Sequence, residues 1–439
     1  MKVLWLLNEM LPDLAVALGK PSPIGGGWLV ALSRALRQEG TIRLGVASRV
    51  VGGNRFSISL GGIQHFTVPA PPKGFGLLRP TKQMLHRYQE IVDEFSPDVI
   101  HVHGTEWYGG MVTVHNRMGR PVIIALQGLI DYHRRHLLGQ LGFMDIVMSR
   151  TVREWVLFSG LWKQRAQWNK RSAVEREIIS GHRAFVGRTL WDRAHLRYMN
   201  PNSEYFHCHE MVQKEFFRRE WLVSNANRHT IFSPSASYPL KGFHVLVKAV
   251  AILRREFPGI QVRVPLATFR GSSDRKGIFA RMGGDGYSSY LDALIAKLDV
   301  GGNITPLGPL SSEQMAQEML DAHVFVLSSF VENSPNTMAE ALIVGVPCVV
   351  SLAGGVPSLI DDGHNALGFS PGDEVVLAEQ IRRIFINSDL ANQLSKAGRK
   401  TALSRYSPEP IVKRMTEIYR AIARGDRAGI LETPLGEAF

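Results

Sequence analysis

Two glutamates with seven residues between them, Glu332 and Glu340, lie in the stretch SSFVENSPNTMAEALIVGVP (328–347). Ser334 can act as a helix N-cap and Pro335 as a first helical residue, so the spacing predicts a helix that begins between the carboxylates. The free amides of 334–337 would carry partial positive charge and could bind a diphosphate. Glu340, two turns or less along the helix, could accept hydrogen bonds from sugar hydroxyls. In the competing interpretation Glu332 only complements the helix dipole and Glu340 is solvated.

Three consecutive glycines, Gly25, Gly26 and Gly27, precede an apolar-periodic helix near the N-terminus. Glycines let a backbone approach a ligand closely, and a helix N-terminus attracts an anionic group. The spacing is not G-x-G-x-x-G, and it lies too far past the first strand for a dinucleotide fingerprint. The triplet therefore indicates either an anion-binding loop or a flexible turn.

A lysine-glycine pair, Lys241 and Gly242, leads another helix. A lysine beside free helix amides can hold a phosphate as a point charge. Lone surface lysines are common, so a structural role is equally compatible with this pair.

Histidines occur in two short runs that could be read as metal ligands. His101 and His103 alternate along a predicted strand, without further Cys or carboxylate partners nearby in the sequence. The HCHE run, 207–210, falls near a predicted domain boundary, where a structural role is favoured. We predict no metal site, and expect His103, at the end of its strand, to line a binding cleft.

Short apolar strands alternate with helical stretches along the whole chain, and continuous apolar runs indicate strands buried on both faces, as in parallel sheets. The predicted strands form two series, 2–7, 43–48, 98–103, 121–126 and 183–187, then 229–235, 261–266, 303–308, 324–329 and 347–351. Two doubly wound α/β domains follow, divided near residues 205–225. Ser407 and Pro408 open a last helix whose Ile411, Met415, Ile418 and Ile422 share one face.

The composition is that of a globular protein: 439 residues, 45% hydrophobic and 21% charged. Two cysteines are too few for a disulfide framework, no apolar run approaches a membrane span, and the apolar N-terminal stretch is too short for a signal peptide. These features predict a cytoplasmic protein. The 51 Lys and Arg against 39 Asp and Glu give +12, which favours an anionic partner.

Half of that excess charge lies in one segment, 134–171, which contains eight basic residues and only two acidic ones. Phe143, Trp155, Phe158, Trp162 and Trp168 interleave with these charges at helical spacing. Such a segment suits a bilayer interface, or it is a solvated helical insert that packs its aromatic residues on the core. Nucleic acid is disfavoured, because no recognised nucleic-acid module accompanies the charge.

The second half of the chain resembles the retaining glycosyltransferases of glycosyltransferase family four, also called glycosyltransferase group 1, which have the GT-B fold. The resemblance rests on PLKGFHVLVKAV (239–250), the E-x7-E element from Glu332 to Glu340, and the motifs at 345–347 and 354–357. The first half matches more loosely, through the glycine loop, PDVIHVHGTEW (97–107) and GRTLWDRA (187–194).

The resemblance implies two Rossmann-like domains facing across a cleft. An acceptor-binding domain would span 1–215 and include the segment 134–171, a nucleotide-sugar-binding domain would span 216–405, and a C-terminal helix and tail would span 406–439. Glu332, Lys241 and His103 would form the catalytic set. The donor would be held by Gly25, Gly26, Gly27, Arg188, Lys241, Ser334, Pro335, Asn336, Thr337 and Glu340, with Glu340 on the ribose and Glu332 on the transferred sugar.

Two positions depart from the family pattern. Ala236 stands where the family usually has an arginine that binds the diphosphate, so Arg188 is expected to compensate. Gln127 stands where many relatives have a histidine after a strand. The chain has no D-x-D pair, which fits a metal-free site without a cofactor, in which cations and amides stabilise the leaving group.

We therefore expect a retaining, metal-independent glycosyltransferase in polysaccharide or lipopolysaccharide biosynthesis. It would move a sugar from a nucleotide-diphosphate donor to a saccharide acceptor, here expected to be lipid-linked, and act in the cytoplasm at the anionic inner membrane face. The alternatives are a nucleotide-sugar epimerase of similar fold and a non-catalytic protein that binds the membrane surface. Acceptor-independent turnover would identify the epimerase, and membrane binding without donor binding would identify the non-catalytic protein.

Overall fold

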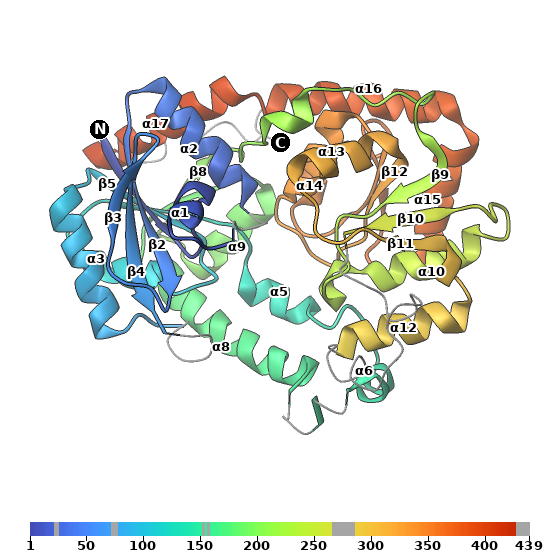
Figure 1. The fold of residues 1–439 in the computed structure, drawn as a ribbon, viewed down its shortest axis with the longest axis horizontal. Helices are drawn as coiled ribbons and strands as arrows, with labels where there is room; N and C mark the ends of the chain where they lie inside the picture. The colour runs from blue at the N-terminus through green and yellow to red at the C-terminus, as the bar shows by residue number, and fades with distance from the viewer. Residues whose placement is uncertain (22–25, 72–77, 152–153, 156–158, 266–285, 427–439) are drawn as a thin grey trace. The chain divides into compact units, whose positions relative to one another are not determined.

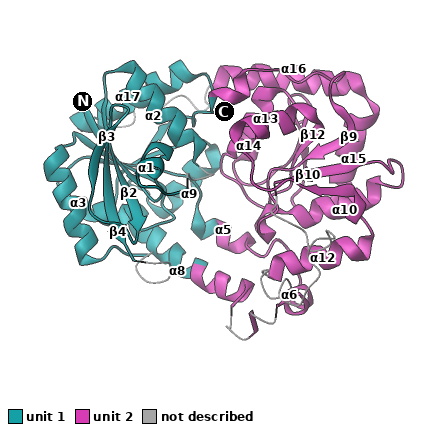
Figure 2. Ribbon diagram, in the orientation of Figure 1, with its two compact units in different colours: residues 1–132, 168–213, 406–439 teal, residues 133–167, 214–405 magenta. Residues whose placement is uncertain are grey.

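The computed structural model describes residues 1–21, 26–71, 78–151, 154–155, 159–265 and 286–426. The chain forms two compact units, coloured teal and magenta in Figure 2. Unit 1 comprises 1–132, 168–213 and 406–439, and unit 2 comprises 133–167 and 214–405. Each unit is built around its own sheet.

Unit 1 contains an eight-stranded sheet of order β3-β4-β2-β1-β5-β6-β7-β8, in which only the β3–β4 pair is antiparallel (Figure 1). Its strands are β1 (Lys2–Leu7), β2 (Arg43–Val51), β3 (Ser57–Leu60), β4 (Ile63–Ala70), β5 (Val99–His103), β6 (Val122–Ala125), β7 (Ala184–Gly187) and β8 (Glu204–His207). Its helices are α1 (Pro12–Ala17), α2 (Gly27–Glu39), α3 (Lys82–Phe95), α4 (Gly109–Thr113), α9 (Leu190–Met199) and α17 (Pro408–Arg424). Two further helices cross a unit boundary along the chain, α5 (Ile130–His136) and α8 (Leu161–Ser180).

Both faces of the unit 1 sheet are buried, which explains its continuous apolar strands. Along β1, Leu4 and Leu6 join one hydrophobic cluster with residues of α3, whereas Val3 and Trp5 join another with residues of α2 and α17. Because successive side chains of a strand point to opposite faces, this division shows helices packed on both sides of the sheet.

Unit 2 contains a six-stranded parallel sheet of order β11-β10-β9-β12-β13-β14. In chain order this is 3-2-1-4-5-6, the order of dinucleotide-binding folds. Its strands are β9 (Asn227–Phe232), β10 (Gln261–Val264), β11 (Ile304–Pro306), β12 (Ala322–Leu327), β13 (Cys348–Ser351) and β14 (Leu367–Phe369). Its helices are α6 (Phe143–Ser149), α10 (Phe243–Leu253), α12 (Gly286–Leu298), α13 (Ser312–Asp321), α14 (Asn336–Val344), α15 (Glu374–Ile386) and α16 (Ser388–Arg405).

The predicted α/β class and the ten predicted strands are confirmed, with ends that differ by a few residues. Four strands were not predicted: β3, β4, β8 and β14. Three of them are only three or four residues long. In the fourth, β4, the buried polar residues His65 and Thr67 interrupt the apolar run, and Pro69 lies near its end.

The observed division differs from the prediction in the segment 134–171. Residues 133–167 belong to unit 2 rather than to the N-terminal domain. The carbonyl of Gly139 lies 2.9 Å from Nε2 of His244 on α10, and the amide of Gly286 on α12 donates to Glu154 at 2.9 Å. These bonds, with the packing of α6 on α12, attach the segment to unit 2.

The C-terminal helix α17 belongs to unit 1, and its predicted start after Ser407 is confirmed. Ile411, Met415 and Ile418 are buried in the cluster that also contains Trp5. The hydroxyl of Tyr419 accepts a hydrogen bond from Nε1 of Trp5 at 3.0 Å. The chain thus returns to its first sheet after completing unit 2.

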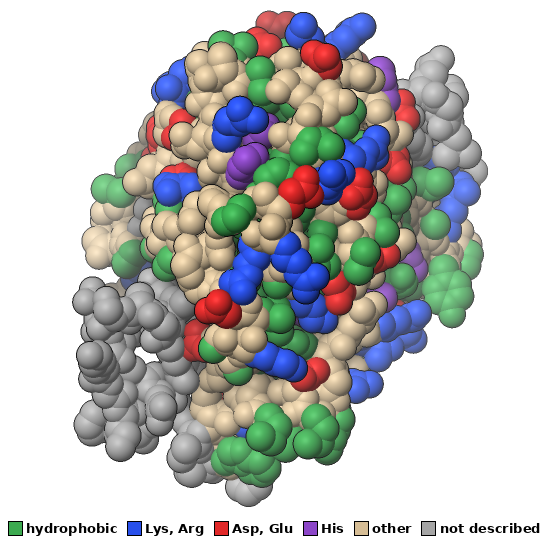
Figure 3. Space-filling view, turned by 90° about the vertical axis from the view of Figure 1, so that its right-hand side faces the viewer, with side chains coloured by type: hydrophobic (Ala, Val, Ile, Leu, Met, Phe, Trp, Pro, Cys, Tyr) green, Lys and Arg blue, Asp and Glu red, His purple; other side chains and the backbone are tan. Residues whose placement is uncertain are grey.

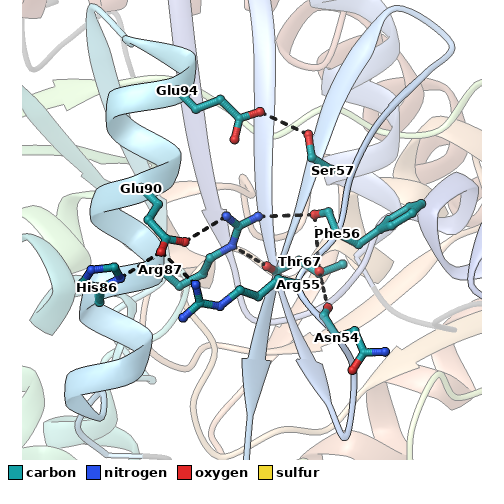
Figure 4. A network of polar contacts seen from close by, with 9 residues as sticks. All are labelled: Asn54, Arg55, Phe56, Ser57, Thr67, His86, Arg87, Glu90 and Glu94. Atoms are coloured by element: carbon teal, nitrogen blue, oxygen red, sulfur yellow. Dashed lines mark hydrogen bonds and ion pairs between the residues drawn. The ribbon is translucent and has the colours of Figure 1, made fainter.

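A polar network centred on Arg87 attaches α3 to the β2–β4 region (Figure 4). The side chain of Arg87 is 9% exposed; its Nε donates to the carbonyl of Thr67 at 3.2 Å and its Nη1 to Glu90 at 3.1 Å. Arg55 and His86 also contact Glu90, at 2.8 and 2.9 Å. The hydrogen bond from Arg87, together with these charges, lowers the pKa of Glu90.

Replacing Arg87 with methionine is expected to destabilise unit 1 by about 2 kcal/mol, because a hydrogen-bonded, buried cation is lost from a buried carbonyl. Arg55→Met is the matched control, since Arg55 contacts the same glutamate but is 53% exposed, and we expect a loss of at most about 0.5 kcal/mol. Urea unfolding followed by tryptophan fluorescence measures both. Equal losses in the two variants would contradict the assignment of Arg87 as the structural cation.

Candidate functional site

The candidate site in unit 2 lies at the carboxyl ends of β9 and β12, which are neighbours in the sheet. The strand order reverses between these two strands, and open α/β sheets bind ligands at such switch points. Lys241 follows β9 and Glu332 follows β12. Residues 91 positions apart in the sequence are thereby brought together.

Lys241 and Glu332 form an ion pair, with Nζ of Lys241 2.6 Å from Oε1 of Glu332. Ser329 donates a second hydrogen bond to Oε1 at 2.7 Å. Burial by itself would raise the pKa of Glu332, but the ammonium of Lys241 and these hydrogen bonds lower it overall. Burial opposes the charge of Lys241 as well, yet Glu332 raises the lysine pKa overall. Both groups are therefore charged at neutral pH, and the lysine side chain remains 24% exposed.

Two glycines allow the loops of the site to pack closely. Gly242 has a φ of +67°, and a Cβ at this position would lie 1.9 Å from the carbonyl oxygen of Ser328. Gly354 has a φ of +59°, and a Cβ there would lie 2.0 Å from the carbonyl oxygen of Glu332. The amide of Gly355 donates to that same oxygen at 2.8 Å. Any side chain at Gly242 or Gly354 would displace the loop that carries Lys241 or Glu332.

Helix α14 begins between the two glutamates, as predicted, but one residue later than expected. Its N-cap is Pro335 rather than Ser334, and no side chain caps it. The reason is that the carbonyl of Pro335 accepts from Met338 and Ala339, so Pro335 itself provides the first acceptor. Among the described residues the amides of Asn336 and Thr337 have no hydrogen-bond acceptor, and they remain available to an anion.

Glu340 lies in the second turn of α14, partly exposed. It has no hydrogen-bond or ion-pair partner in the part of the chain that the structure describes. Burial raises the pKa of its carboxyl to about 8. A desolvated, accessible carboxylate without a protein partner is well suited to accept hydrogen bonds from ligand hydroxyls.

One residue near the ion pair was missed by the sequence analysis. His133 on α5 is close enough to both Glu332 and Lys241 for their charges to affect its titration. Burial lowers the pKa of His133 to about 4, so its imidazole is neutral at pH 7. No sequence signal identifies it, because its segment belongs to the first half of the chain while its neighbours are in unit 2.

The other predicted site residues belong to unit 1. Gly25 lies outside the described residues, Gly26 is the N-cap of α2 with a φ of +76°, and Gly27 begins the helix. Trp28, in the first turn of α2, packs on the ring of His103 at a centroid distance of 5.3 Å. His103 is buried at the end of β5, and both its ring nitrogens lack a hydrogen-bond partner among the described residues. Burial holds the pKa of His103 well below its usual value.

Arg188 is buried and already paired within unit 1. Its guanidinium forms an ion pair with Glu210 and donates to the carbonyls of Leu126 and Gln127. Arg188 would have to leave Glu210 before it could neutralise a phosphate. Ala236, where the family usually has arginine, is buried at 2% exposure.

The sequence analysis also missed two carboxyl groups in unit 1, Glu106 in the loop after β5 and Glu175 on α8. Glu175 accepts hydrogen bonds from Thr105 and from two backbone amides, and burial raises its pKa to about 7. Glu106 accepts from the amide of Gly128 at 2.8 Å, and burial also raises the pKa of Glu106. Trp107 follows Glu106 in the sequence, and the guanidinium carbon of Arg171 lies 4.5 Å from the centroid of its ring.

Among the described residues, no group of three or more His, Cys, Asp or Glu side chains could hold a metal ion. Nδ1 of His101 lies 2.6 Å from the hydroxyl of Tyr419, and the rings of His207 and His209 pack edge to face. These contacts give His101, His207 and His209 packing partners, and the role of His103 stays a prediction. No described helix combines the length and apolarity that a membrane span requires.

Solved structures define the fold of the protein. Sucrose-phosphate synthase from Thermosynechococcus elongatus has a TM-score of 0.72 at 18% identity, covering 97% of this chain and all of that one. HepE from Anabaena, solved in complex with UDP-glucose, has a TM-score of 0.65 at 16% identity, covering 96% of this chain and all of that one. At such identities the likeness concerns the fold alone, and the fold is GT-B.

The sequence of unit 2 matches a known family. Residues 214–401 match the model of the family described as glycosyl transferases group 1, which confirms the predicted resemblance. A D-inositol 3-phosphate glycosyltransferase of Streptomyces coelicolor is 28% identical over 166 residues, 38% of this chain and 35% of the relative. The lipopolysaccharide core biosynthesis glycosyltransferase LpsE of Rhizobium meliloti is 27% identical over 194 residues, which cover 44% of this chain and 50% of the relative. The chain thus spans half or less of these relatives.

Proposed function

We propose that the protein is a glycosyltransferase that moves a sugar from a nucleotide-diphosphate donor to a saccharide acceptor. The observation that carries this proposal is the arrangement at the switch point of unit 2. Lys241 lies in the loop after β9, and the neighbouring helix α14 provides two free amides and the carboxyl group of Glu340, which has no partner among the described residues. The family match of the same residues supports it.

In this proposal each group has one role. Glu340 accepts hydrogen bonds from the ribose hydroxyls, Lys241 and the amides of Asn336 and Thr337 hold the diphosphate, and Glu332 contacts the transferred sugar. That Gly25, Gly26, Gly27 and Arg188 assist at the phosphates, and that His103 contacts the acceptor, stays a prediction.

The transfer we propose retains the anomeric configuration. The bond between C1 of the sugar and the phosphate oxygen breaks, and its electron pair leaves with the nucleoside diphosphate. The acceptor hydroxyl oxygen bonds to C1 on the same face, and its proton passes to the departing phosphate oxygen. Lys241 and the α14 amides stabilise the negative charge that develops there, without a separate base or metal ion.

The acceptor we propose is lipid-linked, in glycan or lipopolysaccharide assembly, and the protein would meet it at an anionic membrane surface from the cytoplasm. The likeness to LpsE supports the first point, and the basic aromatic segment supports the second.

A direct test supplies UDP-, GDP-, ADP- and dTDP-sugars with and without a membrane lipid extract and measures nucleoside diphosphate release. Release that requires the extract supports transfer. Conversion of a donor without any acceptor would identify an epimerase instead. Binding of no nucleotide sugar by folded protein would indicate a non-catalytic binding protein.

The pH dependence of donor binding should report on Glu340. Its pKa of about 8 means that below pH 8 the carboxyl is mostly protonated and must lose a proton to become a full acceptor. Donor affinity is therefore expected to rise by up to about tenfold per pH unit between pH 6 and 8, and to level off above pH 8. Calorimetry with an intact nucleotide sugar avoids the titration of a terminal phosphate. Glu340→Gln should lose this slope, and an unchanged slope would contradict the assignment.

A further inference from the structure

Five large apolar side chains between residues 143 and 162 are exposed to solvent. Phe143 is 67% exposed, Met144 64%, Met148 77%, Trp155 53% and Trp162 38%. All five belong to unit 2, and we call them the α6 patch. Figure 1 places α6 at the lower end of unit 2, and Figure 3, turned about the vertical axis, shows apolar side chains gathered at the lower end of that face.

The exposure follows from how α6 packs. Ile146 and Ser149 are buried, and α6 contacts α12. Phe143 lies beside Trp162 instead, with ring centroids 6.3 Å apart. The interpretation in which the aromatic residues of the segment pack on the core is therefore wrong for Phe143, Trp155 and Trp162, and Phe158 lies outside the described residues. Exposed apolar side chains that gather in this way, three on α6 and Trp162 beside Phe143, mark an interaction surface.

Three cations lie next to the tryptophans of the α6 patch, and none of them has an ion-pair partner among the described residues. Lys163 and Arg165 are exposed and have no ion-pair partner among the described residues. The guanidinium of Arg165 lies 5.9 Å from the ring of Trp162, and that of Arg150 lies 4.3 Å from the ring of Trp155.

The two carboxylates of the segment are engaged by backbone amides. Asp145 accepts from Gly142 at 3.0 Å, and the buried Glu154 accepts from Gly286 at 2.9 Å. These amide hydrogen bonds leave both carboxylates charged, and between residues 143 and 165 four Lys and Arg residues against the two carboxylates give a net charge of +2. The complement of such a surface is one that is anionic with an apolar layer beneath it.

We propose that the α6 patch inserts into the headgroup region of an anionic phospholipid bilayer and anchors the protein through unit 2. Tryptophan, phenylalanine and methionine side chains suit the boundary between headgroups and acyl chains, while lysine and arginine bind the lipid phosphates. A second copy of the chain is a poorer occupant, because in a two-fold contact the unpaired cations would meet each other.

The anchor is connected to the donor site within unit 2. Gly139, just before α6, has a φ of +54°, and a Cβ there would lie 2.3 Å from the carbonyl oxygen of Pro239. The carbonyl of Gly139 also accepts a hydrogen bond from Nε2 of His244, which lies three residues beyond Lys241 in the sequence. The inference rests on the proposed function and deepens it, because the unit that holds the nucleotide sugar would itself lie on the membrane that carries the acceptor.

Vesicle flotation tests the proposal, using phosphatidylcholine vesicles with and without phosphatidylglycerol. Wild type is expected to float with the anionic vesicles, and Phe143→Ser/Met148→Ser/Trp162→Ser should reduce the bound fraction at least tenfold. Lys163→Gln/Arg165→Gln should weaken binding chiefly at low salt. The matched control, Val375→Ser/Ile386→Ser, removes two side chains that are 64% and 55% exposed elsewhere on unit 2 and should bind like wild type.

Failure of wild type to bind anionic vesicles, or equal binding by the triple variant, would overturn the proposal. A concentration-dependent dimer that the triple variant loses, without vesicle binding, would also overturn it and assign the surface to self-association. Calorimetric donor affinity separates this result from the proposed function. The triple variant should bind donor like wild type, and loss of vesicle binding with donor binding intact leaves the transferase proposal standing.

Discussion

Glu340→Ala is expected to raise the dissociation constant of the nucleotide sugar by about 100-fold or more and to reduce transfer to background. Two hydrogen bonds from hydroxyls to a charged acceptor contribute about 1.5–3 kcal/mol each, and every 1.4 kcal/mol is tenfold in affinity. No other described residue in α14 offers a carboxylate. Isothermal titration calorimetry with the best donor measures the effect.

Glu340→Gln supplies the control for folding. The folded pKa of Glu340, about 8, lies above its ordinary value of 4.5, so its ionisation opposes folding increasingly as pH rises from about 4.5 to 8. The glutamine variant is thus expected to be at least as stable as wild type at pH 7.5 while it binds donor weakly. A variant that lost binding only because it lost stability would contradict this account.

Lys241→Met is expected to lower the rate of transfer by about 10²- to 10³-fold, because one preorganised cation at the leaving diphosphate is removed. Because Ala236 stands where the family usually has an arginine, we expect Lys241 to carry more of this charge than it would beside that arginine. The variant should also lose about 2 kcal/mol of stability, since Glu332 would remain largely buried without its partner. Steady-state kinetics and urea unfolding measure the two effects.

The double variant Lys241→Met/Glu332→Gln separates catalysis from folding. Removing both charges should restore most of the lost stability, because neither partner is left unpaired. The rate of transfer should stay low. If the double variant recovered the rate together with the stability, Lys241 would have only a structural role.

Much of the fold could be predicted from the sequence because its strands are continuous apolar runs. β1 was predicted to the residue, and a second series of alternating strands and helices after residue 205 indicated a second α/β domain. Short edge strands such as β14, with three residues, carry too little pattern to be detected. β4 was missed because His65 and Thr67 are buried within it, and no periodicity predicts a buried polar side chain.

The assignment of residues 134–167 to the N-terminal domain failed for a different reason. Helical periodicity indicates which residues share a face, but it does not indicate which unit that face contacts. The close approach of Gly139 to Pro239, 100 positions apart, depends on tertiary structure alone. The same limitation hid His133, whose neighbours Lys241 and Glu332 are distant in the sequence.

The unit 2 site was predictable in larger part, because its residues follow local rules. A helix beginning between Glu332 and Glu340 was expected from Ser334 and Pro335, and it begins one residue later than expected. The ion pair between Lys241 and Glu332 was not expected, since it requires β9 and β12 to be neighbours. Glu340 was predicted to accept hydrogen bonds from a ligand, and it has no protein partner among the described residues.

The central claim is that unit 2 binds a nucleotide-diphosphate sugar through Lys241 and Glu340. The most direct test is a calorimetric titration of wild type and Glu340→Ala with UDP-, GDP-, ADP- and dTDP-sugars. Thermal unfolding with the same ligands provides a second readout, because a ligand that binds the native state raises its apparent stability. The account predicts saturable binding of one nucleotide class to wild type and loss of that binding in the variant. Absence of binding to folded wild type, or equal binding by both proteins, would contradict it.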